Sequence, residues 1–186
     1  MTDKYKDRPY HVAMFVSRNK DNKNVENFKQ RSYSFLTQKY AEELKREFGN
    51  FANQGVQGEM SRFYMSVNER KIEVIRKSLL HYLIDHEDTS LTNLDKLVAS
   101  LATKKGTALT QKWLFDYDWD EDMIDFFIGS LELEGVKNEE VSLTKTPNGY
   151  AIVTEHGFDT RQLLSHWKSV ELKRDGMLFI GDMTKE

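Results

Sequence analysis

The chain shows two hydrophobic periods, one typical of strands and one typical of helices. Alternating apolar, β-branched and aromatic residues predict strands at 10–17, 62–67, 113–118, 141–145, 150–154, 170–172 and 177–180. Apolar residues at three- and four-residue spacing predict amphipathic helices at 35–51, 69–85, 91–103, 120–133 and 158–164. Together these elements predict an α+β fold, with helices packed on a mixed or antiparallel sheet.

Turn and capping residues separate these elements. Asn68 is expected to cap the helix that follows it, because a side-chain oxygen at that position accepts the free N–H groups of the first turn. Thr-Pro-Asn-Gly at 146–149 is typical of a tight turn between strands, and Arg-Asp-Gly at 174–176 predicts a hairpin turn between the last two strands. We expect a single domain, with a strand-and-helix region at 1–60 and the core at 61–186.

Composition limits the chemistry that is open to the chain. Its 186 residues are 39% hydrophobic and 31% charged, as expected for a globular protein. Cysteine is absent, which excludes disulfides, thiolate zinc sites and cysteine nucleophiles, so any metal must be held by oxygen or imidazole ligands. No apolar run reaches the roughly 18 residues of a membrane span, and the N-terminus lacks the apolar core of a signal peptide. We therefore expect a cytoplasmic protein with no membrane contact.

The most distinctive stretch runs from Lys112 to Asp122, KWLFDYDWDED, where aspartate occupies every second position from 116 to 122. In a strand, alternate side chains point to one face, so Asp116 and Asp118 would have Cβ atoms about 6–7 Å apart. Two carboxylates at that separation suit a shared Mg²⁺ or Mn²⁺, since both cations prefer carboxylate oxygen and nucleotide phosphates. We expect Asp116 and Asp118 to be metal ligands.

The same stretch has two other interpretations. In one, Asp116 and Asp118 are solvated residues at a strand end, and Asp120 and Asp122 begin a helix, where acidic side chains suit the helix dipole. In the other, the stretch is a calcium loop of the D-x-D-x-D-G type. That loop is excluded because Glu121 occupies the position of its glycine.

Basic residues before the acidic stretch are candidates for binding phosphate. Arg70, at the start of a predicted helix, is well placed for an anion. The full set of candidates is Arg62, Arg70, Lys71, Arg76, Lys77, Lys104, Lys105 and Lys112. The alternative is that all of them are ordinary surface charges, because no glycine-rich phosphate loop accompanies them. The net charge of −3 does not decide between the two interpretations.

Three short motifs follow one another between residues 62 and 180. They are a strand ending in Asp-x-Asp (WLFDYD), a Thr-Pro-x-Gly turn leading into a strand (TPNGYAIVT), and a Val-acid-hydrophobic-basic segment (VELK). This order resembles the archaeo-eukaryotic primase-polymerase superfamily, and more narrowly small phage-encoded proteins of primase-polymerase-like pattern. The resemblance implies an RRM-like sheet and a site in which Asp116, Asp118 and Glu171 hold Mg or Mn, with Asp175 as a second candidate for the third carboxylate. It further implies that these catalytic carboxylates support nucleotidyl transfer, with a nucleotide or nucleic acid as partner.

One motif position departs from this family. Ala151 stands where the family places the histidine that contacts nucleotide phosphates, and His156 replaces that histidine only if its loop folds back. Three hypotheses follow. The first is an active metal-dependent nucleotidyltransferase, and the second is a catalytically inactive phage or mobile-element accessory protein that binds nucleic acid or a host protein. The third is an interaction protein whose resemblance is accidental.

Lys173 belongs to a further pattern. Lys173-x-Asp175-Gly176 matches the nucleophilic lysine of covalent nucleotidyltransferases such as ligases, in which the lysine attacks an α-phosphate. A turn between two strands explains the same residues, and we expect the turn.

Overall fold

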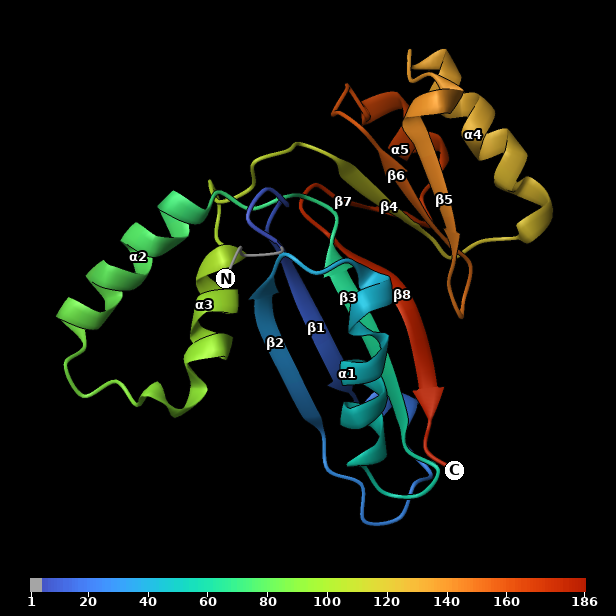
Figure 1. Cartoon of the computed structure of the whole chain (residues 1–186). Helices are drawn as coiled ribbons and strands as arrows, with labels where there is room; N and C mark the ends of the chain where they lie inside the picture. Colours follow the sequence, from blue (N-terminus) through green and yellow to red (C-terminus); the bar gives the residue numbers. More distant parts are fainter. Residues whose placement is uncertain (1–4) are drawn as a thin grey trace.

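The computed structural model describes residues 5–186, and within them the strands form two four-stranded antiparallel sheets accompanied by five α-helices (Figure 1). The α+β class and the antiparallel pairing expected from the sequence are confirmed. The strands are divided between two sheets, where the sequence led us to expect one. In this part of the chain no helix is both long and apolar enough to cross a membrane.

The first sheet combines the N-terminal strands with the last strand of the chain. Its order is β2-β1-β3-β8, formed by Arg31–Thr37, His11–Ser17, Met60–Ser66 and Met177–Thr184. Helix α1, Ala41–Asn53, covers one face, because its apolar stripe packs on alternate residues of the strands. The buried cluster there contains Ala13, Phe15, Leu44, Phe48, Phe51, Phe63 and Met65.

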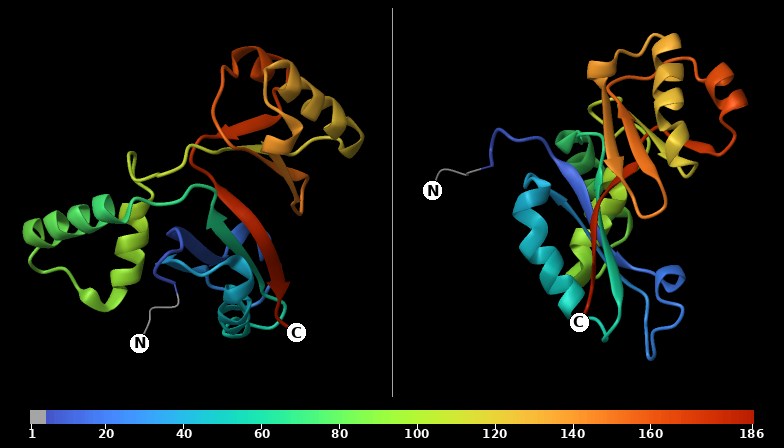
Figure 2. Two further views of the ribbon diagram at one scale, coloured as in Figure 1. Left: turned by 45° about the horizontal axis from the view of Figure 1, so that its top comes forward. Right: turned by 90° about the vertical axis from the view of Figure 1, so that its right-hand side faces the viewer.

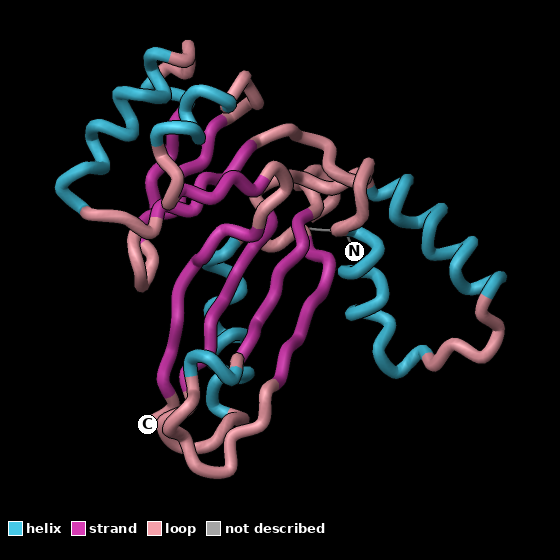
Figure 3. The backbone as a smooth tube through the Cα atoms, turned by 180° about the vertical axis from the view of Figure 1, so that it is seen from behind, coloured by secondary structure: helices cyan, strands magenta, loops and turns pink. Residues whose placement is uncertain are grey.

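Helices α2, Ile72–Asp85, and α3, Leu94–Ala102, form a hairpin at the side of the first sheet (Figure 3). Helix α3 packs along β2, in a cluster that contains Val12, Leu36, Ile75, Ala99 and Ala102. Ile75 is the one buried residue of α2, and the rest of that helix is exposed or half-buried. Helix α2 therefore projects from the body of the protein and is held mainly by α3.

The second sheet has the order β5-β6-β4-β7 and is built from a β-α-β-β-α-β segment. Its elements are β4 Trp113–Tyr117, α4 Ile124–Leu133, β5 Val141–Lys145, β6 Tyr150–Thr154, α5 Arg161–His166 and β7 Val170–Lys173. This connectivity is that of ferredoxin-like sheets, and it fits the RRM-like arrangement expected from the sequence. Short 3-10 helices lie at Asn19–Asp21, Leu91–Asn93, Glu121–Met123 and Asn138–Glu140.

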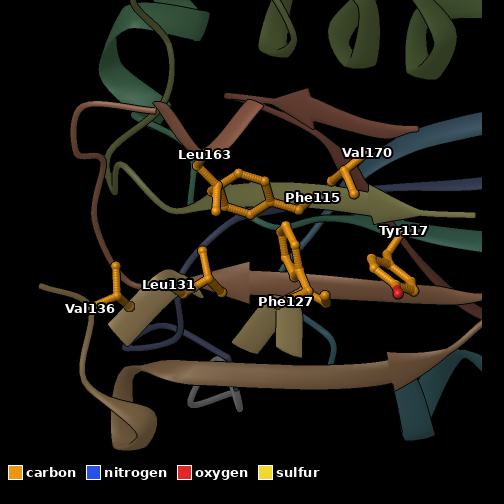
Figure 4. Close-up of a cluster of buried hydrophobic side chains, with 8 residues drawn as sticks. Phe115, Tyr117, Phe127, Leu131, Val136, Leu163 and Val170 are labelled. Atoms are coloured by element: carbon orange, nitrogen blue, oxygen red, sulfur yellow. The ribbon is translucent and has the colours of Figure 1, made fainter. Parts of the chain in front are cut away.

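Both helices of this segment pack on the same face of the second sheet. The buried cluster between them and the sheet contains Phe115, Tyr117, Phe127, Leu131, Val136, Ile152, Leu163 and Val170 (Figure 4). Because Phe115 and Tyr117 of β4 point into this cluster, Leu114 and Asp116 point to the opposite face of the sheet. That opposite face carries the candidate site.

Three local expectations from the sequence are wrong. Residues 35–51 do not form one helix, because Arg31–Thr37 is strand β2 and α1 begins only at Ala41. Asn68 does not cap α2, because its side-chain oxygen accepts the N–H of Lys112 instead. The last two strands do not form a hairpin, since β7 pairs with β4 and β8 pairs with β3.

Buried contacts join the two sheets where the chain crosses from β7 into β8 (Figure 2). The Arg70 side chain is only 1% exposed and donates two hydrogen bonds to Asp175, of 2.7 and 2.9 Å. The Asn68 amide donates to the Lys112 carbonyl at 3.0 Å and to Asp175 at 3.1 Å. A small apolar cluster beside them contains Val67, Leu114, Ala151, Val153 and Leu178. These contacts fix the turn between β7 and β8 against both sheets.

Candidate functional site

The candidate site lies on the face of the second sheet that α4 and α5 do not cover. Asp116 of β4 lies directly opposite Glu171 of β7 on one side and Ala151 of β6 on the other. Residues that lie directly opposite in antiparallel strands share a face and have Cβ atoms about 5 Å apart. The sheet therefore brings Asp116 and Glu171 together, with Ala151 beside them.

Lys173 lies between these two carboxylates and offsets one of their two negative charges. It lies on the same face of β7, opposite Leu114, and its ammonium contacts Asp116 and lies 3.4 Å from Glu171. Burial lowers the pKa of Lys173, but the hydrogen bond and charge of Asp116, supported by Glu171, outweigh this effect and hold that pKa above its usual range. Lys173 thus belongs to the candidate site, where the sequence pattern suggested it only as a nucleophile.

Asp118 lies outside the ladder of hydrogen bonds. Strand β4 ends at Tyr117, whose hydroxyl donates to the Asp120 carbonyl at 3.0 Å, and Asp118 is exposed where the chain turns. Asp120 caps the short helix after the turn, because its side chain accepts a hydrogen bond from the Asp122 N–H. This agrees with the interpretation in which Asp120 and Asp122 begin a helix. Among residues 5–186, no three acidic or histidine side chains converge closely enough to hold a metal ion.

Arg62 and Arg70 are engaged elsewhere in the fold. Arg62 lies on β3 of the first sheet, where its guanidinium donates to Asp21 at 2.7 Å. Arg70 is buried at the junction of the sheets, where it binds Asp175. The Arg70–Asp175 pair therefore has a structural role, and Glu171 is the better placed of the two candidates for a third carboxylate.

Lys112 and His156 lie at the far end of the second sheet from Asp116. Lys112 precedes Asp116 by four residues, about 13 Å along a strand, and its ammonium lies 2.8 Å from Glu155. His156 follows the end of β6, and its Nδ1 lies 3.7 Å from Glu140. The loop that carries His156 does not fold back toward Ala151.

Comparison with known proteins found no relative of this chain. No protein-family model matches the chain, and neither a curated protein nor a solved structure is significantly similar to it. Function has to be inferred from the residues and their geometry.

Gly149, in the turn between β5 and β6, fixes the end of β4 and gives a stability prediction. A Cβ atom on Gly149 would lie 2.1 Å from the carbonyl oxygen of Tyr117, far inside van der Waals contact. Gly149→Ala is therefore expected to lower the free energy of unfolding by about 1–3 kcal/mol, as measured by urea denaturation. Gly129→Ala in α4 is the control, because a Cβ atom there meets no atom within 4 Å. Equal stability of Gly149→Ala and wild type would contradict this close packing.

Proposed function

We propose that this is a primase-polymerase-like protein that binds a divalent cation, and with it the phosphates of a nucleotide or nucleic acid, at Asp116 and Glu171. The supporting observation is the register of β6, β4 and β7. It aligns Ala151, Asp116 and Glu171, the three positions that correspond to the motifs of the resemblance, on one face of a ferredoxin-like sheet. Residues that are far apart in the sequence therefore lie side by side there.

The donor set fits Mg²⁺ or Mn²⁺. Two carboxylates about 5 Å apart on one sheet face can each supply an oxygen, and these cations keep water and phosphate oxygens in their other positions. Asp118, exposed just after the end of β4, is the nearest additional carboxylate along the chain. A bound cation would neutralise the phosphates and lower the pKa of an attacking hydroxyl.

The Lys173 ammonium must move when a cation binds to the site. Its ammonium contacts Asp116 and lies 3.4 Å from Glu171, so a cation can bind both carboxylates only if that ammonium moves away. Once released, the ammonium can donate to a phosphate oxygen of the ligand. In this proposal Lys173 takes the phosphate-contacting role of the missing histidine, because Ala151 offers only a methyl group.

The second candidate is a catalytically inactive accessory protein of a phage or mobile element, acting in the cytoplasm of the host by binding nucleic acid or a host protein. Two observations favour it. Ala151 cannot donate to phosphate, and Lys173 already forms ion pairs with both carboxylates, as in a structural ion-pair network. Under this alternative the site would not take up a divalent cation.

Manganese binding distinguishes the two candidates. Mn²⁺ is expected to raise the melting temperature of the wild type, because a ligand specific for the folded state stabilises it. In the Asp116→Asn, Asp118→Asn double variant, Mn²⁺ affinity measured by calorimetry is expected to fall at least about tenfold, since charged oxygen ligands are lost. Asp122→Asn, an exposed change in the same acidic stretch, is the control and should bind as the wild type does. Equal Mn²⁺ affinity in the double variant and the wild type would sink the proposal, and no Mn²⁺ binding to either would favour the second candidate.

A further inference from the structure

A broad apolar groove lies between α4 and α5, on the opposite side of the second sheet from Asp116. Its volume is about 1230 Å³, and its exposed lining side chains include Trp119, Met123, Phe126 and Leu133. Phe126 is 66% exposed and Leu133 is 90% exposed, which is unusual for side chains of this size. The volume exceeds the roughly 300–1,000 Å³ typical of small-molecule pockets, so the groove suits the face of a helix better than a small ligand.

The α4 side of the groove is strongly acidic. Residues 117–140 contain nine acidic residues and one lysine, a net charge of −8 within a chain whose total is −3. Asp125 and Glu134 line the groove on its α4 side, and Lys168 and His166 line it on its α5 side. This charge repels phosphate, so the groove is unsuited to nucleic acid and suited to an apolar surface flanked by basic residues.

Helix α2 of the same chain carries a surface of that chemistry. Leu80 is 58% exposed and Ile84 is 71% exposed, and both lie on the stripe that Arg76 begins, at four-residue intervals. Lys77 precedes Leu80 by one turn and is exposed. The stripe therefore combines two large apolar side chains with two basic ones, of which Arg76 also contacts Glu73 at 3.4 Å, on a helix that projects from the body of the protein.

Helices α4 and α5, which border the groove, lie at the opposite end of the molecule from α2 (Figure 1). One copy therefore cannot fill its own groove, but two copies can exchange their α2 helices. When both contacts form between the same two copies, this reciprocal exchange gives a closed two-fold dimer, whereas a head-to-tail contact would give an open filament.

We propose that α2 of one copy docks in the α4–α5 groove of a second copy, with Leu80 and Ile84 packed against Phe126 and Leu133. Arg76 and Lys77 then lie toward the acidic side of the groove. Burial of these exposed apolar side chains drives the association, and the opposite charges set its orientation.

Two variants test the two sides of this interface, α2 and the groove, one at a time. Leu80→Glu with Ile84→Glu alters α2 and leaves the groove intact. Gly129→Gln fills the groove and leaves α2 intact, and it is compatible with folding because a Cβ atom at Gly129 meets no atom within 4 Å. Melting curves of both variants verify that they are folded before association is measured.

Sedimentation equilibrium over a concentration series tests the proposal. The wild type is expected to show a mass that rises above the 21.8 kDa of one chain, and each variant alone is expected to dissociate at least about tenfold more readily. An equimolar mixture of the two variants should regain association, because one supplies an intact groove and the other an intact α2. A wild type that stays monomeric overturns the proposal, even if its groove takes up a basic amphipathic peptide. So does a mixture that fails to associate when the wild type does.

Discussion

Replacing Asp175 with alanine is expected to lower the free energy of unfolding by about 3 kcal/mol, which is near the lower end of the effect of breaking a buried ion pair. The reason is that Arg70, only 1% exposed, would keep its charge in the interior without the two hydrogen bonds that Asp175 accepts. Asp175 itself is 32% exposed, so some water can reach the guanidinium, and we expect the lower end of that range for this reason. Urea denaturation monitored by circular dichroism measures the change.

An exposed ion pair of the same residue types provides the matched control. Asp159 and Arg161 contact each other near α5, with side chains that are 59% and 89% exposed, and Asp159→Ala should leave the urea midpoint close to that of the wild type. A double variant, Arg70→Met with Asp175→Ala, should be more stable than Asp175→Ala alone, because it removes the unpaired charge as well. Wild-type stability in Asp175→Ala would show that this pair does not hold the two sheets together.

The elements that the sequence predicted best are those whose signals are local. The strands β5 and β6 and the turn between them follow from alternating residues on either side of Thr-Pro-Asn-Gly. Strand β2 was not predicted, because Leu36 stands four residues before Tyr40, which in turn stands four before Leu44. The apolar residues of β2 and of α1 therefore follow one four-residue spacing, and the predicted helix began within β2.

The pairing of distant segments could not be predicted from such local signals. Lys173 meets Asp116 only because β7 pairs with β4 in the register that places Lys173 opposite Leu114. Arg70 meets Asp175 across 105 positions of the sequence, although the sequence suggested Arg70 as a phosphate ligand or surface charge and Asp175 as a turn residue or metal ligand. The proximity of Asp116 and Glu171 was anticipated through the resemblance and not through periodicity, which carries no information about strand order.

Lys173→Met is expected to strengthen Mn²⁺ binding by about 10- to 100-fold, because the variant removes the ammonium that competes with the cation for Asp116 and Glu171. Two unit charges about 4 Å apart interact by about 4 kcal/mol at the effective dielectric constant of a protein surface. The Lys173 side chain is 35% exposed, so solvent screening reduces this competition to about 1.4–2.7 kcal/mol. Methionine retains most of the apolar stem without the charge. Isothermal titration of Mn²⁺ into the variant and the wild type measures the difference.

The raised pKa of Lys173 means that its ammonium competes with Mn²⁺ at neutral pH, so the wild type cannot gain Mn²⁺ affinity there by losing this proton. Because Asp116 and Glu171 hold that pKa above its usual range, the ammonium stays charged at neutral pH and competes with the cation throughout the physiological range. Wild-type Mn²⁺ affinity should therefore not rise through deprotonation of Lys173 until the solution is strongly alkaline. Lys137→Met, in a lysine that is 68% exposed and distant in sequence from β7, controls for the loss of one positive charge from the whole protein. If Lys173→Met and Lys137→Met bind Mn²⁺ equally well, the carboxylates beside Lys173 are not the metal site.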